Sequence, residues 1–351
     1  MGRTFAAELL SRLNPARIDT LFSVMRKEAE MEQFIVTGGA GLIGSNLVAA
    51  LNARGIDDIL VVDHLNHPAK ERNLAALAYR RYLDRDAFRE ALRTGRLAPA
   101  RTLFHLGACS STTETDQAYL DDNNTGTTRE LCAWCLAGGT RFIYASSAAT
   151  YGDGEQGYSD DDAVTPRLQP LNLYGWSKQK FDLIALREGW LDRIAGLKYF
   201  NVFGPGEAHK GEMRSVIHKA YHQICETGAF ALFRSHRPEY ADGGQVRDFV
   251  YVKDAVAVTL FFHDHPEVSG LYNCGTGQAR SWLDLLRAIY AAMEREPRID
   301  FVDMPPHLRD KYQYFTEADT RKLRAAGCGH AFQPLEQAVA DYVRQHLEAR
   351  P

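Results

Sequence analysis

Short apolar runs alternate with segments of helical spacing along the first two hundred residues. The segment after the first run carries Leu47, Val48 and Leu51 on one helical face, and Gly55 stands where that helix would end. A further helix is predicted from about 119 to 137, opened by the polar residues 121–124. The apolar runs predicted as buried strands are 34–36, 59–62, 101–106, 141–145 and 194–200. This alternation predicts an α/β fold with a Rossmann-type, doubly wound parallel sheet.

The pattern changes after Gly204 and Pro205. Short strands are predicted there at 231–233, 248–251 and 299–302, between helices at 215–227, 282–293 and 335–347. We therefore expect a smaller C-terminal α/β domain over 204–351, after a larger domain over 31–203 to which later segments return. Residues 1–30 form an N-terminal extension, either a docking helix pair or translated upstream sequence ahead of Met31.

Glycines join the first predicted strand to the first predicted helix. Gly38, Gly41 and Gly44 allow a tight turn and a close approach of backbone to a pyrophosphate, whose charge the helix N-terminus stabilises. Asp63 ends the second strand, where an acid can hold ribose hydroxyls. An ordinary glycine-rich turn is the alternative, but strand, glycines, helix, strand and acid follow in order. The larger domain is thus predicted to bind a dinucleotide.

Composition narrows the classes of partner. The 351 residues carry a formal net charge of -4, so we expect no nucleic-acid partner. No apolar run reaches the length of a membrane span, so no membrane partner is expected. The six cysteines suggest no disulfide framework, and without a signal peptide we expect a reducing, cytoplasmic location. Cys132 and Cys135 are interpreted as buried structural thiols, and His218 and His222 lack further ligands, so no metal is expected.

A tyrosine and a lysine follow the strand that ends at Ser147. Tyr174 and Lys178 are four residues apart on a predicted helix and so share one face. A nearby cation favours phenolate and lowers the pKa of a tyrosine, which suits proton transfer. Ser147 could donate a hydrogen bond to a substrate oxygen beside the phenol. A solvated helix pair is the alternative, but the dinucleotide fold favours the catalytic interpretation.

These motifs carry a family resemblance. The glycine loop together with Tyr174 and Lys178 resembles the extended short-chain dehydrogenase/reductase family. Further stretches resemble the members of that family that epimerise an ADP-heptose; they are residues 107–114, 144–152, 199–211, 247–252 and 311–313. The similarity runs from about Phe34 to the C-terminus and leaves 1–30 outside.

The resemblance implies an epimerase for a lipopolysaccharide-core precursor. It would convert ADP-D-glycero-β-D-manno-heptose to the L-glycero epimer, by oxidising C6 with bound NADP and returning the hydride to the opposite face. Tyr174 and Lys210 would be the two proton-transfer residues, with Lys178 on the nicotinamide ribose and Ser147 assisting. Asp63 by itself favours NAD, which stays the weaker alternative, whereas Lys70, Arg72 and Arg85 could attract a 2′-phosphate. A homo-oligomer is also implied.

Binding residues follow from the same resemblance. The cofactor is assigned to the strand ends and the loops after them: Gly38, Gly41, Leu42, Ile43, Gly44, Asp63, His64, Lys70, Arg85, Leu106, Gly107, Ala108, Cys109, Ser110, Asn123, Lys178 and Val202. The substrate is assigned mainly to the C-terminal region: Asn201, Glu212, Lys219, Phe233, Arg234, Ser235, His236, Arg247 and Tyr312. Glu212 departs from the small hydroxyl residue usual there, and is expected to point away or to meet a cation such as Arg214.

The rival functions are other nucleotide-sugar enzymes and a catalytically silent nucleotide-binding regulator. Dehydratases of this fold resemble one another in having an Asp-Glu pair directly after the strand-end hydroxyl residue, which serves to eliminate water. Ala148 and Ala149 follow Ser147 here, so the acid and the base for elimination are missing. A UDP-hexose 4-epimerase is the main alternative, and Lys210 argues against it. Intact Ser147, Tyr174 and Lys178 argue against the silent regulator.

Overall fold

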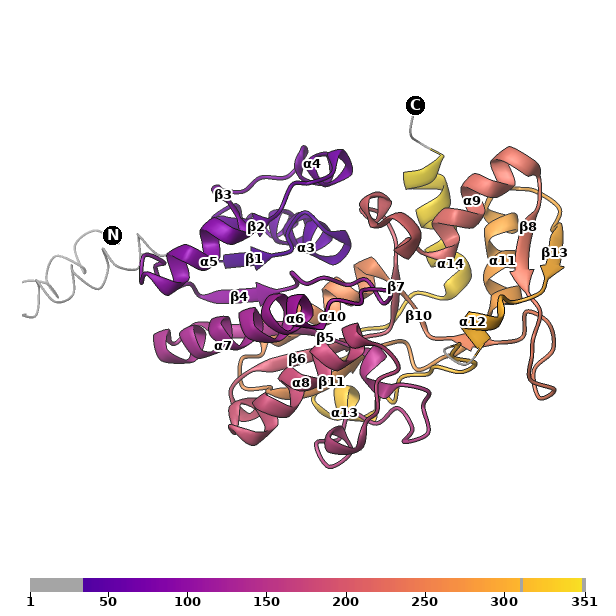
Figure 1. Cartoon of the computed structure of the whole chain (residues 1–351). Coiled ribbons are helices and arrows are strands. Elements are labelled where there is room, and N and C mark those ends of the chain that lie inside the picture. The colour runs from indigo at the N-terminus through magenta and orange to yellow at the C-terminus, as the bar shows by residue number, and fades with distance from the viewer. Residues whose placement is uncertain (1–33, 310–311, 349–351) are drawn as a thin grey trace, which may run out of the picture.

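A seven-stranded parallel sheet forms the centre of the computed structural model, which describes residues 34–309 and 312–348. The predicted extension at 1–30 lies outside the described residues. The strands are β1 (Phe34–Thr37), β2 (Ile59–Asp63), β3 (Arg81–Asp84), β4 (Thr102–His105), β5 (Arg141–Ser147), β6 (Ala195–Tyr199) and β11 (Gly270–Cys274). Their order is β11-β6-β5-β4-β1-β2-β3, which confirms the predicted doubly wound sheet (Figure 1).

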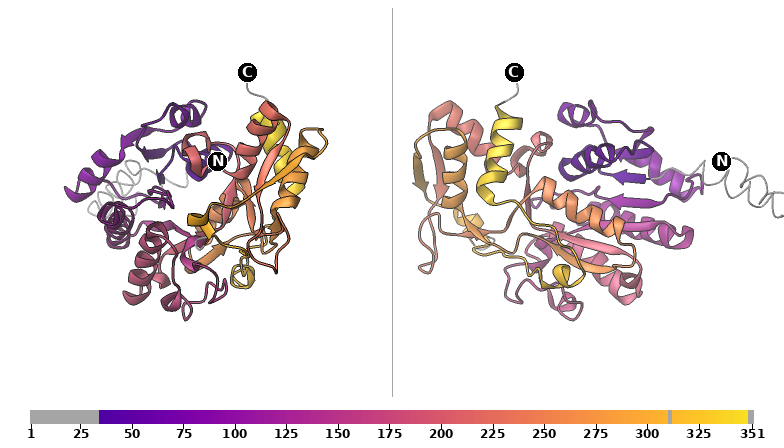
Figure 2. Two further views of the ribbon diagram at one scale, coloured as in Figure 1. Left: turned by 45° about the vertical axis from the view of Figure 1, so that its right-hand side comes forward. Right: turned by 180° about the vertical axis from the view of Figure 1, so that it is seen from behind.

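Helices cover both faces of this sheet because its central strands β1, β2 and β4 are buried on both sides. Phe34 and Val36 of β1 pack with α3 (Leu42–Ala53) and α10 (Val252–Asp264), while Ile35 faces the opposite layer. That layer holds α5 (Arg85–Arg93), α7 (Thr127–Gly138) and α8 (Leu173–Arg187). Figure 2 shows α3 and α10 side by side when the molecule is seen from behind. Alternate residues of one strand therefore serve two separate cores.

The helix predicted from 119 starts earlier than expected. It begins as α6 (Gln117–Leu120), where the Asp116 carboxylate caps the N–H of Tyr119 at 2.9 Å. It continues through the π-helical turn η1 (Asp121–Gly126) into α7. The prediction that residues 121–124 open the helix was therefore wrong. A capping carboxylate one turn upstream sets the start, and η1 carries Asn123 and Asn124 toward the ends of the strands.

The C-terminal region adds three small sheets and a helical layer. The paired strands are β7 (Asn201–Phe203) with β10 (Phe249–Tyr251), β8 (Phe230–Phe233) with β13 (Ile299–Val302), and β9 (Val246–Arg247) with β12 (Arg280–Ser281). The helices are α9 (Val216–Thr227), α11 (Trp282–Ala292), and α14 (Leu335–Tyr342) continued by the π-helical turn η6 (Val343–Leu347). Shorter helices are α4 (Pro68–Leu74), η2 (Ala148–Tyr151), η3 (Thr165–Arg167), η4 (Trp190–Asp192), η5 (Ala208–Met213), α12 (Pro306–Arg309) and α13 (Arg321–Ala325).

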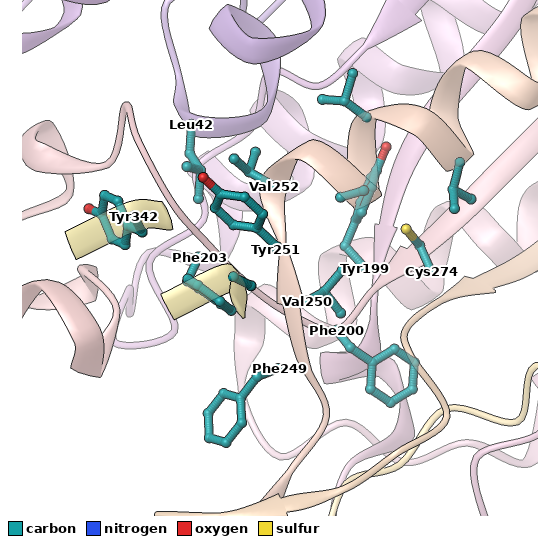
Figure 3. Packing of buried hydrophobic residues seen from close by; sticks show 14 of the residues in the cluster. Leu42, Tyr199, Phe200, Phe203, Phe249, Val250, Tyr251, Val252, Cys274 and Tyr342 are labelled. Atoms are coloured by element: carbon teal, nitrogen blue, oxygen red, sulfur yellow. The ribbon is translucent and has the colours of Figure 1, made fainter. Parts of the chain in front are cut away.

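One hydrophobic core joins this region to the sheet. Figure 3 shows Phe203 and Tyr251 below Leu42, the first residue of α3, and their rings lie 5.5 Å apart. Tyr342 of α14 belongs to the same core. Because α10 and β11 come after residue 204 yet pack on or within the sheet, the chain crosses between the two parts more than once. The domain limits at 31–203 and 204–351 stay a prediction. No helix among the described residues is long and apolar enough to cross a membrane.

Candidate active site

The glycine loop between β1 and α3 has no room for side chains. A Cβ atom on Gly44 would stand 2.1 Å from the carbonyl oxygen of Gly38. Gly38 has φ +68°, and a Cβ there would meet the backbone of Gly107 at 2.6 Å. The backbone therefore turns closely past the ends of β1 and β4 and leaves the first turn of α3 open toward the cleft. This cradle fits the pyrophosphate of a dinucleotide.

Asp63 at the end of β2 is held in place from three sides. Its Oδ2 accepts from the N–H of Ala40 at 2.9 Å, and its Oδ1 accepts from the N–H of His64 and from Lys70 Nζ, both at 2.7 Å. The ion pair with Lys70 is largely buried. These contacts fix the Asp63 carboxylate where it could accept hydrogen bonds from ribose hydroxyls. Lys70 partly neutralises its negative charge.

Beyond Asp63 a pocket opens between β2, α5 and η1. The predicted residues His64, Arg85, Cys109 and Asn123 line it. Its apolar walls come from Phe88, Leu92 and Leu131, and Asn66 and Tyr119 stand at its edge. An apolar slot of about 240 Å³ beside the ribose acid fits an adenine ring. The sequence analysis missed these wall residues, although Phe88 and Leu92 do recur at helical spacing.

A larger cleft of about 440 Å³ runs along the carboxyl ends of the strands. It brings together Ser147 of β5, Tyr174 and Lys178 of α8, and Lys210, which come from three separate segments of the chain. The remaining predicted cofactor residues line the same cleft: Gly38, Gly41, Leu42, Ile43, Gly44, Asp63, Lys70, Leu106, Gly107, Ala108, Ser110 and Val202. The strand ends named from the sequence thus meet at one place, as parallel strands require.

The Tyr174 phenol differs from the expectation. Burial raises its pKa above the ordinary value, and a hydrogen bond with Ser147 only partly opposes this. The expectation that Lys178 lowers the pKa of Tyr174 was wrong for the protein without ligand. Lys178 Nζ instead donates to the carbonyl of Ala145 at 2.7 Å, and burial lowers the pKa of Lys178 to about 8. Burial is thus the main influence on both groups, and it disfavours the charged form of each.

Lys210 enters the cleft on η5, a 3₁₀ segment interrupted at Gly211, which has φ +53°. Burial lowers the pKa of Lys210, and the negative charge of Glu207 opposes this. A base at this position needs a lowered pKa, and the burial that the two-base scheme requires is the main cause here. A lysine in such surroundings loses its proton more easily and can serve as a base.

The segment 205–215, here called the strap, is anchored to both parts of the molecule. Asn46 donates to the carbonyl of Pro205 at 2.8 Å, and Asn73 donates to the carbonyls of Gly206 and Ala40, both at 2.9 Å. These bonds fasten the strap to the glycine loop. They leave Lys210 at the edge of the dinucleotide site.

On its other side the strap is held by Glu207, which is only 1% exposed. Its carboxylate accepts from the N–H of Ser215 at 2.5 Å, from Ser215 Oγ at 2.6 Å and from Tyr342 Oη at 2.9 Å. His209, missed by the sequence analysis although it adjoins Lys210, also lines the cleft. Burial and the charge of Lys70 lower the pKa of His209 to about 4, so its ring is neutral at pH 7.

The predicted substrate residues are more dispersed. Asn201 is exposed and lines the cleft. Arg247 is buried between two aromatic rings, 5.5 Å from the Trp282 centroid and 5.3 Å from that of Tyr312. Trp282 lines the cleft and donates to Tyr312 Oη at 2.9 Å. Trp282 therefore links Arg247 to the cleft. The sequence analysis did not predict Trp282 or Phe249, which also lines the cleft.

Other predicted substrate residues surround β8 outside the cleft lining. Arg234 pairs with Asp242 at 3.1 Å, and Phe233, Ser235 and His236 adjoin it. Glu212 is exposed and lies 3.6 Å from Lys219 Nζ. The cation beside Glu212 is therefore Lys219, and the suggestion of Arg214 was wrong, because Arg214 Nε donates to the carbonyl of Gly211 at 2.7 Å. The roles of these residues stay predictions.

The cysteine and histidine pairs belong to no second site. Cys132 and Cys135 are buried on α7, and burial raises the pKa of Cys132 to about 12 and that of Cys135 as well. The rings of His218 and His222 lie 4.6 Å apart. Among residues 34–309 and 312–348, no group of three metal-ligating side chains comes together.

Comparison with known proteins agrees with this geometry. A protein named ADP-L-glycero-D-manno-heptose-6-epimerase from Nitratidesulfovibrio vulgaris strain DP4 is 56% identical over 317 residues, 90% of this chain and 98% of its own length. A protein of the same name from Fusobacterium nucleatum is 45% identical over 325 residues, 89% of this chain and 97% of its own length.

Solved structures of nucleotide-sugar epimerases have the same fold. The crystal structure of a Helicobacter pylori ADP-L-glycero-D-manno-heptose-6-epimerase superposes with a TM-score of 0.77 at 26% identity, over 92% of this chain and 97% of that one. A Bacillus cereus UDP-glucuronic acid 4-epimerase holding UDP-glucuronic acid and NAD has a TM-score of 0.71 at 24% identity, over 89% of this chain and 99% of that one. The latter likeness concerns the fold alone.

A family model matches the sheet, the glycine loop and most of the cleft in one continuous stretch. The matched residues are 34–275, well over half of the chain. The chain belongs to the NAD dependent epimerase/dehydratase family.

Proposed function

We propose that this chain is an ADP-heptose 6-epimerase, which inverts C6 between the D-glycero and L-glycero forms of ADP-glycero-β-D-manno-heptose. Two proton-transfer candidates on different segments of one cleft carry the proposal, namely Tyr174 on α8 and Lys210 on the strap. The names of relatives at 45 to 56% identity support the choice of substrate.

Inversion at one carbon requires the sugar to present both of its faces to the same hydride carrier. A nicotinamide dinucleotide held by the glycine loop, Asp63 and Lys178 would supply the hydride chemistry at C6, without net oxidation. Each orientation of the sugar brings the C6 oxygen to a different side of the cleft. A single proton donor cannot reach that oxygen in both orientations, because proton transfer needs hydrogen-bond distance.

We assign one proton-transfer residue to each orientation of the sugar. Tyr174 exchanges a proton with the C6 oxygen in one orientation, and Ser147 hydrogen-bonds the same oxygen beside it. Lys210 exchanges the proton in the other orientation, for which burial makes its amine easier to deprotonate by lowering its pKa. Lys178 holds the nicotinamide ribose and places a positive charge near Tyr174 when that phenol ionises. Asn201, Lys219, Arg247, Tyr312 and residues 233–236 are assigned to the ADP-heptose.

A UDP-hexose 4-epimerase is the alternative within the family. Ser147, Tyr174 and Lys178 would serve either reaction, but the buried approach of Lys210 to the cleft gives the second proton-transfer group that the heptose reaction needs. Elimination is disfavoured because Ala148 and Ala149 of η2 offer no acid or base after Ser147.

A turnover assay distinguishes these functions. The purified chain is incubated with ADP-D-glycero-β-D-manno-heptose and, separately, with UDP-galactose, and the products are resolved by chromatography and proton NMR. Conversion of the heptose alone is expected. Turnover of UDP-galactose without the heptose would assign the chain to the 4-epimerases, and turnover of neither would favour a silent nucleotide binder.

For the cofactor we propose NADP rather than NAD. Lys70 pairs with Asp63 and so offsets the charge that repels a 2′-phosphate, and Arg85 stands in the same pocket, 3.4 Å from Asn123. Mass spectrometry of the nucleotide that copurifies with the chain should find the mass of NADP. Recovery of NAD alone would contradict this choice.

The family resemblance supports a homo-oligomer, and the sparse cysteines support a cytoplasmic location. Light scattering of the purified chain measures the first, and fractionation of cells that produce it measures the second.

A further inference from the structure

Beneath the cleft lies an ion pair that the proposed chemistry does not use. Lys198 of β6 and Asp182 of α8 are both 0% exposed, and Lys198 Nζ lies 2.7 Å from Asp182 Oδ2. Removing two charges from water is costly, and such a pair is often no more stabilising than well-packed apolar residues of the same volume. Stability is therefore a weak reason for placing these charges in the core.

The pair sits in a complete hydrogen-bond network. Asp182 also accepts from Tyr144 Oη at 2.8 Å and from Ser146 Oγ at 2.7 Å. Lys198 Nζ also donates to Thr150 Oγ1 at 2.8 Å. The five side chains come from β5, η2, β6 and α8, so the network joins four elements at one buried point.

This network adjoins three residues of the proposed chemistry. Ser146 directly precedes Ser147, and Thr150 Oγ1 donates to the carbonyl of Ser147 at 2.8 Å. On α8, Asp182 lies one turn beyond Lys178 and two turns beyond Tyr174. The strand end that carries the serine and the helix that carries the phenol and the amine are thus fastened together below the cleft floor.

We propose that Asp182 and Lys198 are positioning residues that set the distance and register between Ser147 on β5 and Tyr174 and Lys178 on α8. The inference rests on the proposed function in so far as it assigns chemistry to those three residues. Each charge gives its partner strong, directional hydrogen bonds that an apolar contact lacks, and small displacements of reacting groups cost much of the rate.

Asp182 has a second, electrostatic effect. Its negative charge raises the pKa of Lys178 and so opposes the burial that lowers it. Cys109, in the loop after β4, also raises the pKa of Lys178 through its charge. His105 of β4 is also near, but burial lowers its pKa to about 3, so it stays neutral. Loss of Asp182 therefore makes Lys178 easier to deprotonate.

A double-mutant cycle separates positioning from stability. Asp182→Asn and Lys198→Met each leave a buried charge without its partner, so both should lower Tm and kcat. The double variant removes both charges and should recover most of the lost Tm, with the cofactor retained. Its kcat should stay roughly tenfold to a hundredfold low, with KM changed much less, because the serine and the phenol are no longer held in register. Recovery of kcat together with Tm would overturn the proposal.

Two further variants keep the test decisive if a charged single variant fails to fold. Ser146→Ala removes one hydrogen bond that the Asp182 carboxylate accepts but keeps the ion pair, so it should lower kcat several-fold with a smaller loss of Tm than either charged single variant. Full activity would contradict the network. Asp254→Asn is the matched control, because Asp254 is a buried carboxylate on α10 that accepts from His330 Nε2 at 2.9 Å and from the N–H of Gln333 at 3.1 Å. It should lower Tm without a selective loss of kcat.

A readout without substrate separates this inference from the proposed function. In protein labelled with ¹³C at lysine Cε, Lys178→Met assigns the Lys178 signal, and its titration is compared between the unsubstituted chain and the double variant. A shift of its midpoint to lower pH is expected, and an unchanged midpoint would count against the network. An unsubstituted chain that fails to turn over ADP-heptose would contradict the proposed function but not this result.

Discussion

Both lysines of the cleft are withdrawn from water, Lys178 almost fully and Lys210 in part, and this burial determines how readily they ionise. It lowers the pKa of both Lys178 and Lys210, since the ammonium form loses hydration. The same burial raises the pKa of Tyr174, so the phenol keeps its proton until substrate and cofactor change its surroundings. The cleft therefore rests with a protonated phenol beside amines that deprotonate readily.

The Lys178 amine should make stability depend on pH. Its pKa is about 8 in the folded protein, against roughly 10.4 in an unfolded chain, so the unfolded state binds more protons between these values. The free energy of unfolding of the unsubstituted chain, relative to Lys178→Met, should rise with pH across this window, by roughly 1 kcal/mol per unit. Urea unfolding of both cofactor-free proteins from pH 7 to 10 measures the difference. A difference that is flat with pH would contradict the lowered pKa.

Separate substitutions of Tyr174 and Lys210 test the division of proton transfer. Tyr174→Phe and Lys210→Met should each lower kcat for epimerisation about a hundredfold to ten-thousandfold, while the cofactor stays bound. Dismutation of a C6 aldehyde analogue, followed by NMR, reports the proton transfers without inversion. If Lys210→Met raises only KM and keeps kcat at saturation, Lys210 is an anchor for the diphosphate and the two-base scheme fails.

At the scale of elements, the strap determines where Lys210 stands. Residues 205–215 are fastened to the glycine loop through Asn46 and Asn73, and to α9 and α14 through Glu207. A 3₁₀ segment of six residues cannot hold a lysine in place by its own hydrogen bonds. Its position comes from these anchors on either side.

Glu207→Gln should weaken the second anchor without altering the cofactor site. The amide keeps the size of the carboxylate but loses its charge and one acceptor, so we expect kcat to fall about tenfold with little change in cofactor content. In a Lys210→Met background the same substitution should have almost no further effect, since both act on one step. Steady-state kinetics of the four proteins measures this coupling, and additive losses would show that Glu207 acts elsewhere.

For the whole molecule, the parallel sheet determines which segments meet. Every strand of the sheet ends at the same edge, so the glycine loop, Asp63, Ser147 and Asn201 converge although more than 160 residues separate the first from the last. β11 and α10 return from the C-terminal region to complete the sheet and one of its helical layers. The regions that carry the predicted cofactor and substrate residues are thereby joined through one hydrophobic core.

The βαβ unit from β1 to β2 is complete without the predicted extension. We expect a chain that begins at Met31 to fold, to retain its nucleotide and to turn over at an unchanged rate. Circular dichroism, nucleotide content and kcat of the shortened and full-length chains make the comparison. Loss of any of the three would show that residues 1–30 contribute to the fold or to the site.

Local sequence determined much of this protein. Apolar runs bounded by glycines and acids specified β1, β2, β4, β5 and β6 to within one or two residues, because such runs bury both of their faces. The loop between Gly38 and Gly44 and the spacing of Tyr174 and Lys178 are properties of a few consecutive residues. Both motifs could therefore be named as candidates for a site before any contact was known.

Tertiary structure alone decided the features that depend on distant residues. The pKa of Tyr174 is raised because burial, which no local pattern reports, outweighs the hydrogen bond with Ser147. Lys219 rather than Arg214 meets Glu212, and Trp282 reaches the cleft from a helix far along the chain. The Asp182–Lys198 pair arises only when α8 packs on β6. Short-range patterns specify elements and motifs. Solvent exclusion and long-range contacts determine how the side chains of the cleft ionise and which residues they contact.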